Sequence, residues 1–294
     1  MKKIFVFVML LSLALGVRAQ LLWKVSGNGL EKPSYIMGTH HLAPLSITDS
    51  IASLPQAMEQ AEQVYGEIVM GDAITPEVIM KMQQAMVLPG DTTLKSLVTP
   101  AQYDTIAAVV KQYLGMDLEI FNKVKPSAIT TQLVVAASVK LLKDFNPKEQ
   151  LDAWFQEQAR QAGKKVGSLE TIEQQCQILY NSQPLARQAL LLYCTATHIG
   201  QSMDQALRMT RAYMKQDLFG LQTAMEEKLG NACDSTPEEL DTMIYGRNEN
   251  WAGQMPAIMK QAPTLFVVGA GHLPGKKGLL KLLQNRGYTV EAMQ

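Results

Sequence analysis

The sequence predicts an α/β fold in which two βαβ-containing ends form one central sheet and a largely helical middle lies between them. Three observations lead to this prediction. Apolar runs of strand length alternate with helix-periodic stretches over residues 21–70, and the same alternation returns over 264–292. Between these ends, from about residue 75 to 260, helix-periodic segments dominate. Because strand–helix alternation is typical of parallel sheets, we expect both ends to share one sheet.

The first nineteen residues have the pattern of a secretory signal peptide. Lys2 and Lys3 form a basic start, Ile4 to Leu15 is an apolar stretch, and Val17-Arg18-Ala19 has the small residues of a cleavage site. We expect removal of this leader to leave residues 20–294 as a single exported domain, periplasmic or secreted. No later run of about 18 apolar residues is present, so no transmembrane segment is expected.

The N-terminal end contains two predicted strands, Leu21–Val25 and Ser34–Met37, joined by the glycine-rich turn Ser26–Gly29. Apolar residues then recur at helical spacing from Ile51 to Ala61, after an N-cap at Asp49 or Ser50. The apolar run Val64–Met70 has the length of a buried strand. This order of elements predicts a first parallel βαβ unit.

Helix-start signals open the middle of the chain. Thr75-Pro76 and Thr99-Pro100 each place an N-cap before a first-turn proline, and Pro126 precedes a long apolar-periodic stretch to Leu142. One interruption, Lys164–Leu169, reads as a further strand. Later helices are expected over 185–199, 203–229 and 237–260.

The C-terminal end repeats the earlier pattern. Thr264–Val268 is a predicted strand, Gly278–Asn285 a helix and Tyr288–Ala292 a strand, which makes a second βαβ unit.

The charge balance argues against a nucleic-acid partner. The 27 basic and 27 acidic side chains cancel, and loss of the leader leaves a small acidic excess. Nucleic-acid binders carry a basic surface instead. The three cysteines, Cys176, Cys194 and Cys233, fit one disulfide plus one buried thiol, with the pairing open. Their spacing matches neither a zinc site nor a Cys-x-x-Cys redox pair. The oligomeric state is not set by the sequence.

Histidines are concentrated in two matching segments. Three of the four fall in Gly38-Thr39-His40-His41 and Gly269-Ala270-Gly271-His272, each at the end of a predicted strand. Reactive groups of open parallel sheets sit at such strand ends, and glycine lets the backbone turn sharply or approach a ligand. A single copy would as readily be a loop or capping residue. The repetition predicts that His41 and His272 face one cleft.

The remaining two histidines are expected to have supporting roles. His40 has no counterpart in the second segment, where Gly271 stands, and we interpret it as support for its neighbour. His198 lies near a helix end before Gly200 and is expected to cap that helix.

Glu67 interrupts the apolar run Val64–Met70. A buried carboxylate is costly unless it is paired, hydrogen-bonded or bound to metal, although a strand-end position that reaches solvent would also explain it. Together with His41 and His272 it forms a set suited to a divalent metal with open positions. Such a metal lowers the pKa of bound water and polarises a carbonyl group, so hydrolysis is the natural consequence. Glu67 is therefore both a predicted metal ligand and a candidate general base.

Two further charged residues are candidates for catalysis. Arg247 interrupts the last long helix and could stabilise an oxyanion or hold a substrate carboxylate, although an ordinary helix surface is the alternative. Glu170 follows the predicted strand at Lys164–Leu169. Its alternative role is a first-turn charge that complements the helix dipole.

In their order and spacing these segments resemble the TraB/GumN family, which includes the TIKI metalloproteases. The resemblance spans essentially the whole mature chain. It rests on Gly38-Thr39-His40-His41, Glu67, Leu169-Glu170-Thr171, Arg247-Asn248, Gly269-Ala270-Gly271-His272-Leu273 and Gly287-Tyr288.

The resemblance implies an α/β fold related to the erythromycin esterase and ChaN-like proteins. It also implies that the active-site signature maps onto His41, His272 and Glu67, and that manganese or cobalt is favoured over zinc. His40, Asn248, Gly38 and Gly269 are expected to support these groups. Some family members carry a C-terminal membrane segment, and none is expected here.

The predicted function is a metal-dependent hydrolase, most simply a peptidase that acts on peptides or protein termini. The alternative is a non-catalytic protein that uses the same cleft to bind a peptide, a metal or haem, because a fold does not fix a function.

Overall fold

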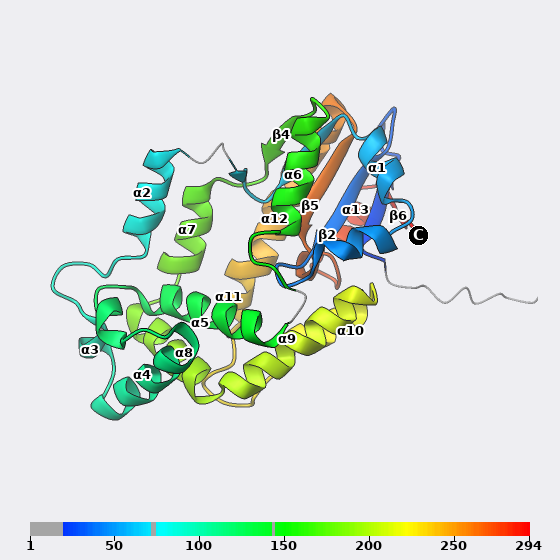
Figure 1. Ribbon diagram of the computed structural model, residues 1–294. Helices are drawn as coiled ribbons and strands as arrows, with labels where there is room; N and C mark the ends of the chain where they lie inside the picture. Colours follow the sequence, from blue (N-terminus) through cyan, green and yellow to red (C-terminus); the bar gives the residue numbers. More distant parts are fainter. Residues whose placement is uncertain (1–19, 72–74, 143–144) are drawn as a thin grey trace, which may run out of the picture.

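The computed structural model describes residues 20–71, 75–142 and 145–294. The leader predicted at residues 1–19 lies outside them. Within the described residues, strands form one six-stranded open sheet in the order β4-β3-β5-β2-β1-β6 (Figure 1). The strands are β1 Leu22–Ser26, β2 Ser34–Thr39, β3 Gln63–Gly66, β4 Lys165–Ser168, β5 Thr264–Gly269 and β6 Thr289–Ala292.

Four neighbouring strands, β4, β3, β5 and β2, are parallel, whereas β1 runs antiparallel between β2 and β6. The central strands β2 and β5 are almost entirely buried. Burial on both faces explains why they read as continuous apolar runs rather than as alternating ones.

The helices form two groups according to where they lie relative to the sheet. Those packed on the sheet or beside its edge are α1 Leu54–Gln60, α6 Leu151–Gln161, α7 Ile172–Asn181, α9 Ile199–Met214, α10 Leu218–Met225, α12 Gly246–Gln261 and α13 Leu279–Asn285. Those of the remaining helical region are α2 Pro76–Ala85, α3 Leu94–Leu97, α4 Pro100–Leu114, α5 Pro126–Leu141, α8 Leu185–Thr197 and α11 Pro237–Leu240. Short 3-10 turns occupy Leu45–Ser50, Leu118–Phe121 and Ala270–His272.

The sheet is the middle layer of its part of the molecule. Helices α1 and α6 cover one face, while α12 and α13 cover the other (Figure 1). The Tyr35 hydroxyl of β2 donates to Gln60 of α1, whereas the Gln63 amide of β3 donates to the Ile258 carbonyl of α12. A second, smaller core joins α3, α4, α5 and α8 away from the sheet. The predicted sheet with a helical middle is therefore confirmed.

The two ends of the chain interleave instead of lying side by side. Strand β5, from the C-terminal end, lies between β2 and β3 and pairs parallel with both. Strand β6 lies beyond β2 and β1 and pairs antiparallel with β1. Each predicted strand–helix–strand unit thus exists along the chain, but its two strands are not neighbours in the sheet.

The strand predicted over Val64–Met70 was too long, because β3 ends at Gly66. A Cβ on Gly66 would lie 2.4 Å from Gln156 Nε2 of α6. The Gln156 amide also bonds the Ile68 carbonyl and the Met70 N–H. These bonds draw the chain away from the sheet, so Glu67 follows the strand and does not interrupt it.

Two helix predictions need similar corrections. The helix expected over 203–229 is broken at Gln216, whose φ of 57° is left-handed, and Asp217 caps the new helix α10 by accepting from the Gly220 N–H. The helix expected over 237–260 is continuous but contains a π-helical turn, Asp241–Tyr245, before α12.

Cys194 of α8 is disulfide-bonded to Cys233, and Cys176 is a buried thiol. The cysteine pairing that the sequence left open is therefore Cys194–Cys233. His198 stands at the C-terminal cap of α8, as predicted. Among the described helices, none is long and apolar enough to cross a bilayer.

Candidate functional site

The carboxyl ends of β2, β3 and β5 meet at one edge of the sheet. Thr39, the last residue of β2, pairs with Gly269, the last residue of β5, and Gly66, the last residue of β3, pairs with Val267, two residues before Gly269. The residues that follow these strand ends are the ones that the sequence singled out. Parallel register therefore brings both Gly-x-x-His segments and Glu67 to the same edge.

Neighbouring groups approach both motif glycines closely. A Cβ on Gly38 would lie 2.8 Å from Leu273 and 3.1 Å from Ala270, so the turn after β5 packs directly on β2. Gly269 donates its N–H to Glu67 Oε1 at 2.8 Å, and a Cβ there would come within 3.3 Å of the same oxygen. Each glycine thus lets backbone and side chains of neighbouring strands meet.

The guanidinium of Arg247 joins the two predicted carboxylates. Its Nη2 donates to Glu67 Oε2 at 2.6 Å and to Glu170 Oε1 at 2.5 Å, and its Nε donates to Glu170 Oε2 at 3.1 Å. The side chains of Arg247 and Glu67 are each 11% exposed and that of Glu170 is 3% exposed. The Gln175 amide of α7 donates to both carboxylates. Arg247 and Glu170 are therefore buried and paired. Arg247 does not lie on an ordinary helix surface, and Glu170 is not an unpaired charge in the first turn of a helix.

The π-helical turn at Asp241–Tyr245 lies directly before Arg247. The Gly246 N–H bonds to the Asp241 carbonyl, five residues back, and Arg247 Nη1 donates to the Met243 carbonyl at 3.1 Å. The guanidinium also lies over the Trp251 ring, 4.6 Å from its centroid. Such turns widen a helix locally and are frequent at functional sites.

His272 is held in one tautomer by Asn248. The Asn248 Nδ2 donates to the carbonyls of His272 and Lys277, so its Oδ1 must accept from the His272 Nδ1–H at 2.7 Å. The unprotonated Nε2 then lies 3.9 Å from Glu67 Oε1 and 3.2 Å from Arg247 Nη1. This is the arrangement in which an imidazole binds a metal or accepts a proton.

Burial lowers the pKa of His272 to about 4, and the charges of Arg247 and His41 act in the same direction. The imidazole is therefore neutral near pH 7. Burial alone would raise the pKa of Glu67, but the charge that His272 carries when protonated, the charge of Arg247 and the Gly269 N–H outweigh it and hold this pKa below its ordinary value. Glu67 is an anion that is already satisfied by its donors.

His41 occupies the open side of the site. Its side chain is 68% exposed, and its Nδ1 lies 3.4 Å from Asp152 Oδ2 of α6. The nearby carboxylate of Asp152 raises the pKa of His41 to about 9, and the charge of Glu67 adds to this effect. The charge of Glu67 raises the pKa of His41 and that of Arg247 lowers it, while the charge of His41 lowers the pKa of His272. The four side chains therefore interact electrostatically.

His40 faces α9 instead. Thr210 Oγ1 donates to the Ala206 carbonyl, so it accepts from His40 Nε2, 2.9 Å away. The His40 ring packs at 5.4 Å from that of Tyr213, whose hydroxyl donates to the Gly38 carbonyl. Burial lowers the pKa of His40 to about 4. His40 thus braces the first Gly-x-x-His turn.

Three residues of this site were missed by the sequence analysis: Asp152, Gln175 and Trp251. Trp251 is fully buried, and the centroid of its ring lies 4.5 Å from that of His272. Its indole therefore packs against both His272 and Arg247. A tryptophan or a glutamine in a helix carries no special local signal. Asp152 follows Leu151 on the buried face of α6, and a carboxylate at a core position was a signal that could have been found.

The predicted three-ligand set is only partly brought together. His272 and Glu67 face each other with Arg247 against both, whereas His41 stands toward solvent. In residues 20–71, 75–142 and 145–294, no group of three or more His, Cys, Asp or Glu side chains is arranged to hold a metal ion. A neutral imidazole nitrogen and a carboxylate oxygen, which face each other here, are nevertheless donor types that divalent metals accept.

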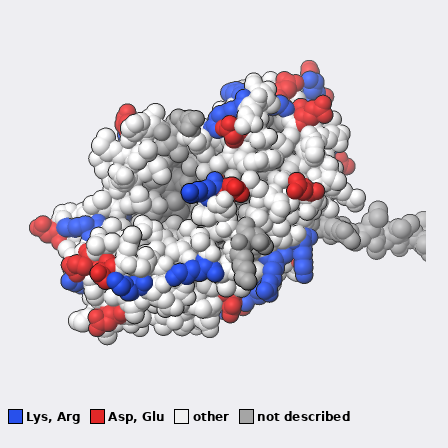
Figure 2. All heavy atoms as spheres, viewed as in Figure 1, with Lys and Arg blue, Asp and Glu red and all other residues white. Residues whose placement is uncertain are grey.

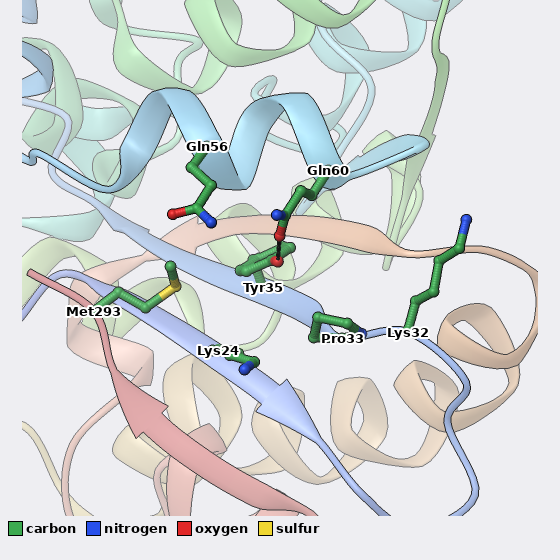
Figure 3. Close-up of a pocket in the computed structure, with 7 residues that line it drawn as sticks. All are labelled: Lys24, Lys32, Pro33, Tyr35, Gln56, Gln60 and Met293. Atoms are coloured by element: carbon green, nitrogen blue, oxygen red, sulfur yellow. Dashed lines mark hydrogen bonds between the residues drawn. The ribbon is translucent and has the colours of Figure 1, made fainter.

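A cavity of about 560 Å³ lies at the opposite end of β2, against α1 (Figure 3). Its lining residues are Lys24, Lys32, Pro33, Tyr35, Gln56, Gln60 and Met293. Tyr35 is the second residue of β2 and the Gly-x-x-His turn follows the other end of this strand, so the length of β2 separates the cavity from the candidate site.

The fold and the site define an α/β protein with a histidine–carboxylate–guanidinium cluster at the carboxyl edge of a parallel sheet. The chain belongs to the TraB/PrgY/gumN family, whose model matches residues 21–292. This match confirms the family resemblance predicted from the motifs.

Its relatives include proteins named metalloproteases. Metalloprotease TIKI2 of Danio rerio is 23% identical over 318 residues, which cover 92% of this chain and 60% of the relative. Metalloprotease TIKI1 of Danio rerio is 23% identical over 304 residues, covering 89% and 61%. Metalloprotease TIKI1 of Homo sapiens is 21% identical over 305 residues, covering 89% and 60%. The chain thus spans about 60% of the length of these relatives. No solved structure gives a significant match.

Proposed function

We propose that this protein is an exported, divalent-metal-dependent hydrolase that cleaves peptides or protein termini. The observation that carries the proposal is the neutral His272, whose unprotonated Nε2 lies 3.9 Å from Glu67 Oε1 and 3.2 Å from Arg247 Nη1. His41, His272 and Glu67 would hold the metal. Manganese or cobalt is favoured by the family resemblance, and zinc also accepts this nitrogen and oxygen donor set. The names of the relatives support a peptide or protein substrate.

The bound ion would polarise the scissile carbonyl and lower the pKa of a water molecule. The chain's own residues supply the rest of the chemistry. Asn248 fixes the His272 tautomer, and Glu170 and Glu67 fix the guanidinium of Arg247. All five N–H groups of Arg247 already have partners, so its positive charge would stabilise negative charge that develops on the carbonyl oxygen through space rather than through a direct hydrogen bond.

The hydrogen bonds of Glu67 bear on its role. Its carboxylate accepts from the Gly269 N–H and from Arg247, and its pKa is held below the ordinary value. Such a carboxylate is a weak base. Its surroundings therefore favour a ligand role for Glu67 over that of general base.

The surface is compatible with a protein substrate. On the face seen in Figure 2, acidic and basic side chains are interspersed with wide uncharged areas, and this face is hollowed between the helical part and the sheet. A nucleic-acid binder would instead present a continuous basic surface.

The test uses the chain from Gln20 onward, stripped of metal with a chelator and reloaded with manganese, cobalt or zinc. A peptide library is digested and cleavage is followed by mass spectrometry. We expect metal-dependent cleavage that is lost in His41→Ala and His272→Ala and retained in His198→Gln, a matched change at a helix cap.

Undiminished cleavage in both folded alanine variants would overturn the proposal. Tight peptide, metal or haem binding without cleavage under any metal would favour the non-catalytic alternative.

A further inference from the structure

Asp152 is a buried carboxylate directly beneath the first Gly-x-x-His turn. It is 6% exposed and lies in the first turn of α6 between the fully buried Leu151 and Phe155. Its Oδ1 accepts from Thr39 Oγ1 at 2.9 Å. Its Oδ2 is buried without a hydrogen bond of good geometry, and the imidazole of His41 lies 3.4 Å away. A buried carboxylate oxygen left in this way is costly, so its retention calls for a reason.

The arrangement of Asp152 mirrors that of Asn248. On one face of the sheet, Asn248 of α12 accepts from Nδ1 of His272. On the other face, Asp152 of α6 meets Nδ1 of His41. The two imidazoles are thus held from the same ring nitrogen by two helices. In each case Nδ1 is the nitrogen that meets the helix residue and Nε2 is the other ring nitrogen, which in His272 contacts Arg247 Nη1.

We propose that Asp152 is the positioning residue of His41. Thr39 anchors one carboxylate oxygen and leaves the other to hold the Nδ1–H of His41, so that Nε2 is directed toward Glu67 and His272. A side chain that is 68% exposed would otherwise sample several rotamers. The metal-binding part of this inference rests on the proposed function, whereas the contact itself does not.

The alternative role for Asp152 is that of an acidic residue that complements the dipole of α6. Glu157, on the same helix, provides a matched control because its side chain is 55% exposed. Glu157→Gln removes one negative charge from α6 without touching the first Gly-x-x-His turn. Asp152→Asn removes the charge and keeps the shape, and Asp152→Ala removes the acceptor as well.

The first measurement is manganese affinity by titration calorimetry. Loss of a residue that orients a metal ligand costs about 10- to 100-fold in metal affinity. We expect that loss in Asp152→Ala, a smaller one in Asp152→Asn and none in Glu157→Gln. If Asp152 acts through His41, adding Asp152→Asn to His41→Ala should weaken binding no further. Equal affinities in Asp152→Ala and Glu157→Gln, or additive losses in the double variant, would overturn the inference.

The second measurement needs no metal. Long-range nitrogen–proton correlation spectra of the metal-free protein report the ring of His41 directly. We expect a downfield Nδ1–H signal for His41 in the wild type and in Glu157→Gln, and its loss in Asp152→Ala. Absence of manganese binding by the wild type would refute the proposed metal site, whereas an Nδ1–H signal unchanged in Asp152→Ala would refute the positioning role.

Discussion

Replacement of Arg247 by glutamine should destabilise the protein strongly at neutral pH. Arg247 is the cation between Glu67 and Glu170, whose side chains are only 11% and 3% exposed. Removal of one partner of a buried ion pair costs about 3–5 kcal/mol, because the other charge stays buried without compensation. Two carboxylates depend on this one guanidinium, so we expect a loss near the upper end, about 5 kcal/mol.

The size of this loss should depend on pH. In the wild type the pKa of Glu67 is lowered, so its ionisation contributes stability above the unfolded pKa, and that contribution is lost on acidification. In Arg247→Gln, burial and the neighbouring carboxylate should raise the folded pKa of Glu67 above the unfolded value. The variant is then most penalised near pH 7.5 and recovers relative to wild type as the pH falls toward 5. Each unit by which this pKa rises recovers about 1.4 kcal/mol.

Urea unfolding followed by circular dichroism at pH 7.5 and pH 5 measures both effects. Arg286→Gln is the control, since Arg286 pairs with an exposed glutamate, Glu249, and should cost about 1 kcal/mol or less. Adding Glu67→Gln to Arg247→Gln should restore part of the stability at pH 7.5. A loss of unfolding free energy in Arg247→Gln no larger than in the control, or a loss that grows on acidification, would show that Glu67 and Glu170 do not depend on this guanidinium.

Three further predictions concern stability. Burial lowers the pKa of His272 to about 4, so its neutral form contributes stability above pH 6.5. This stability, about 3 kcal/mol in all, is lost as the pH falls from 6.5 to 4. His272→Gln should therefore flatten this part of the pH profile in urea titrations. Gly38→Ala should cost about 1–3 kcal/mol in the same assay, because its Cβ would lie 2.8 Å from Leu273, and an unchanged midpoint would contradict this packing. Reduction of the Cys194–Cys233 disulfide, which closes a separation of 39 residues, should cost about 2–4 kcal/mol, and an equal melting temperature with and without reductant would refute it.

Local patterns in the sequence predicted the elements and the strand ends. Apolar runs placed β2 and β5 within two residues, and threonine–proline pairs marked the starts of α2 and α4. Strand and helix periodicity are set by neighbouring residues, so they can be read from the chain. The same holds for the two Gly-x-x-His segments, which do follow strands. Their metal-binding role stays a prediction.

Long-range packing decided the rest. The insertion of β5 between β2 and β3 depends on contacts between residues that are about 200 positions apart, and no local period encodes them. Glu67 follows its strand because Gln156, from a distant helix, ends β3. The cysteine pairing likewise depends on which segments the fold brings together.

The sequence by itself determined which residue types stand at the strand ends of this protein, because strand length, glycine position and histidine spacing are local properties. Only the tertiary structure decided how those residues behave. It placed Arg247 between two carboxylates, fixed the tautomer of His272 through Asn248 and set Asp152 beneath His41. The physical reason is that the charge state and orientation of a side chain depend on burial and on partners that distant segments supply.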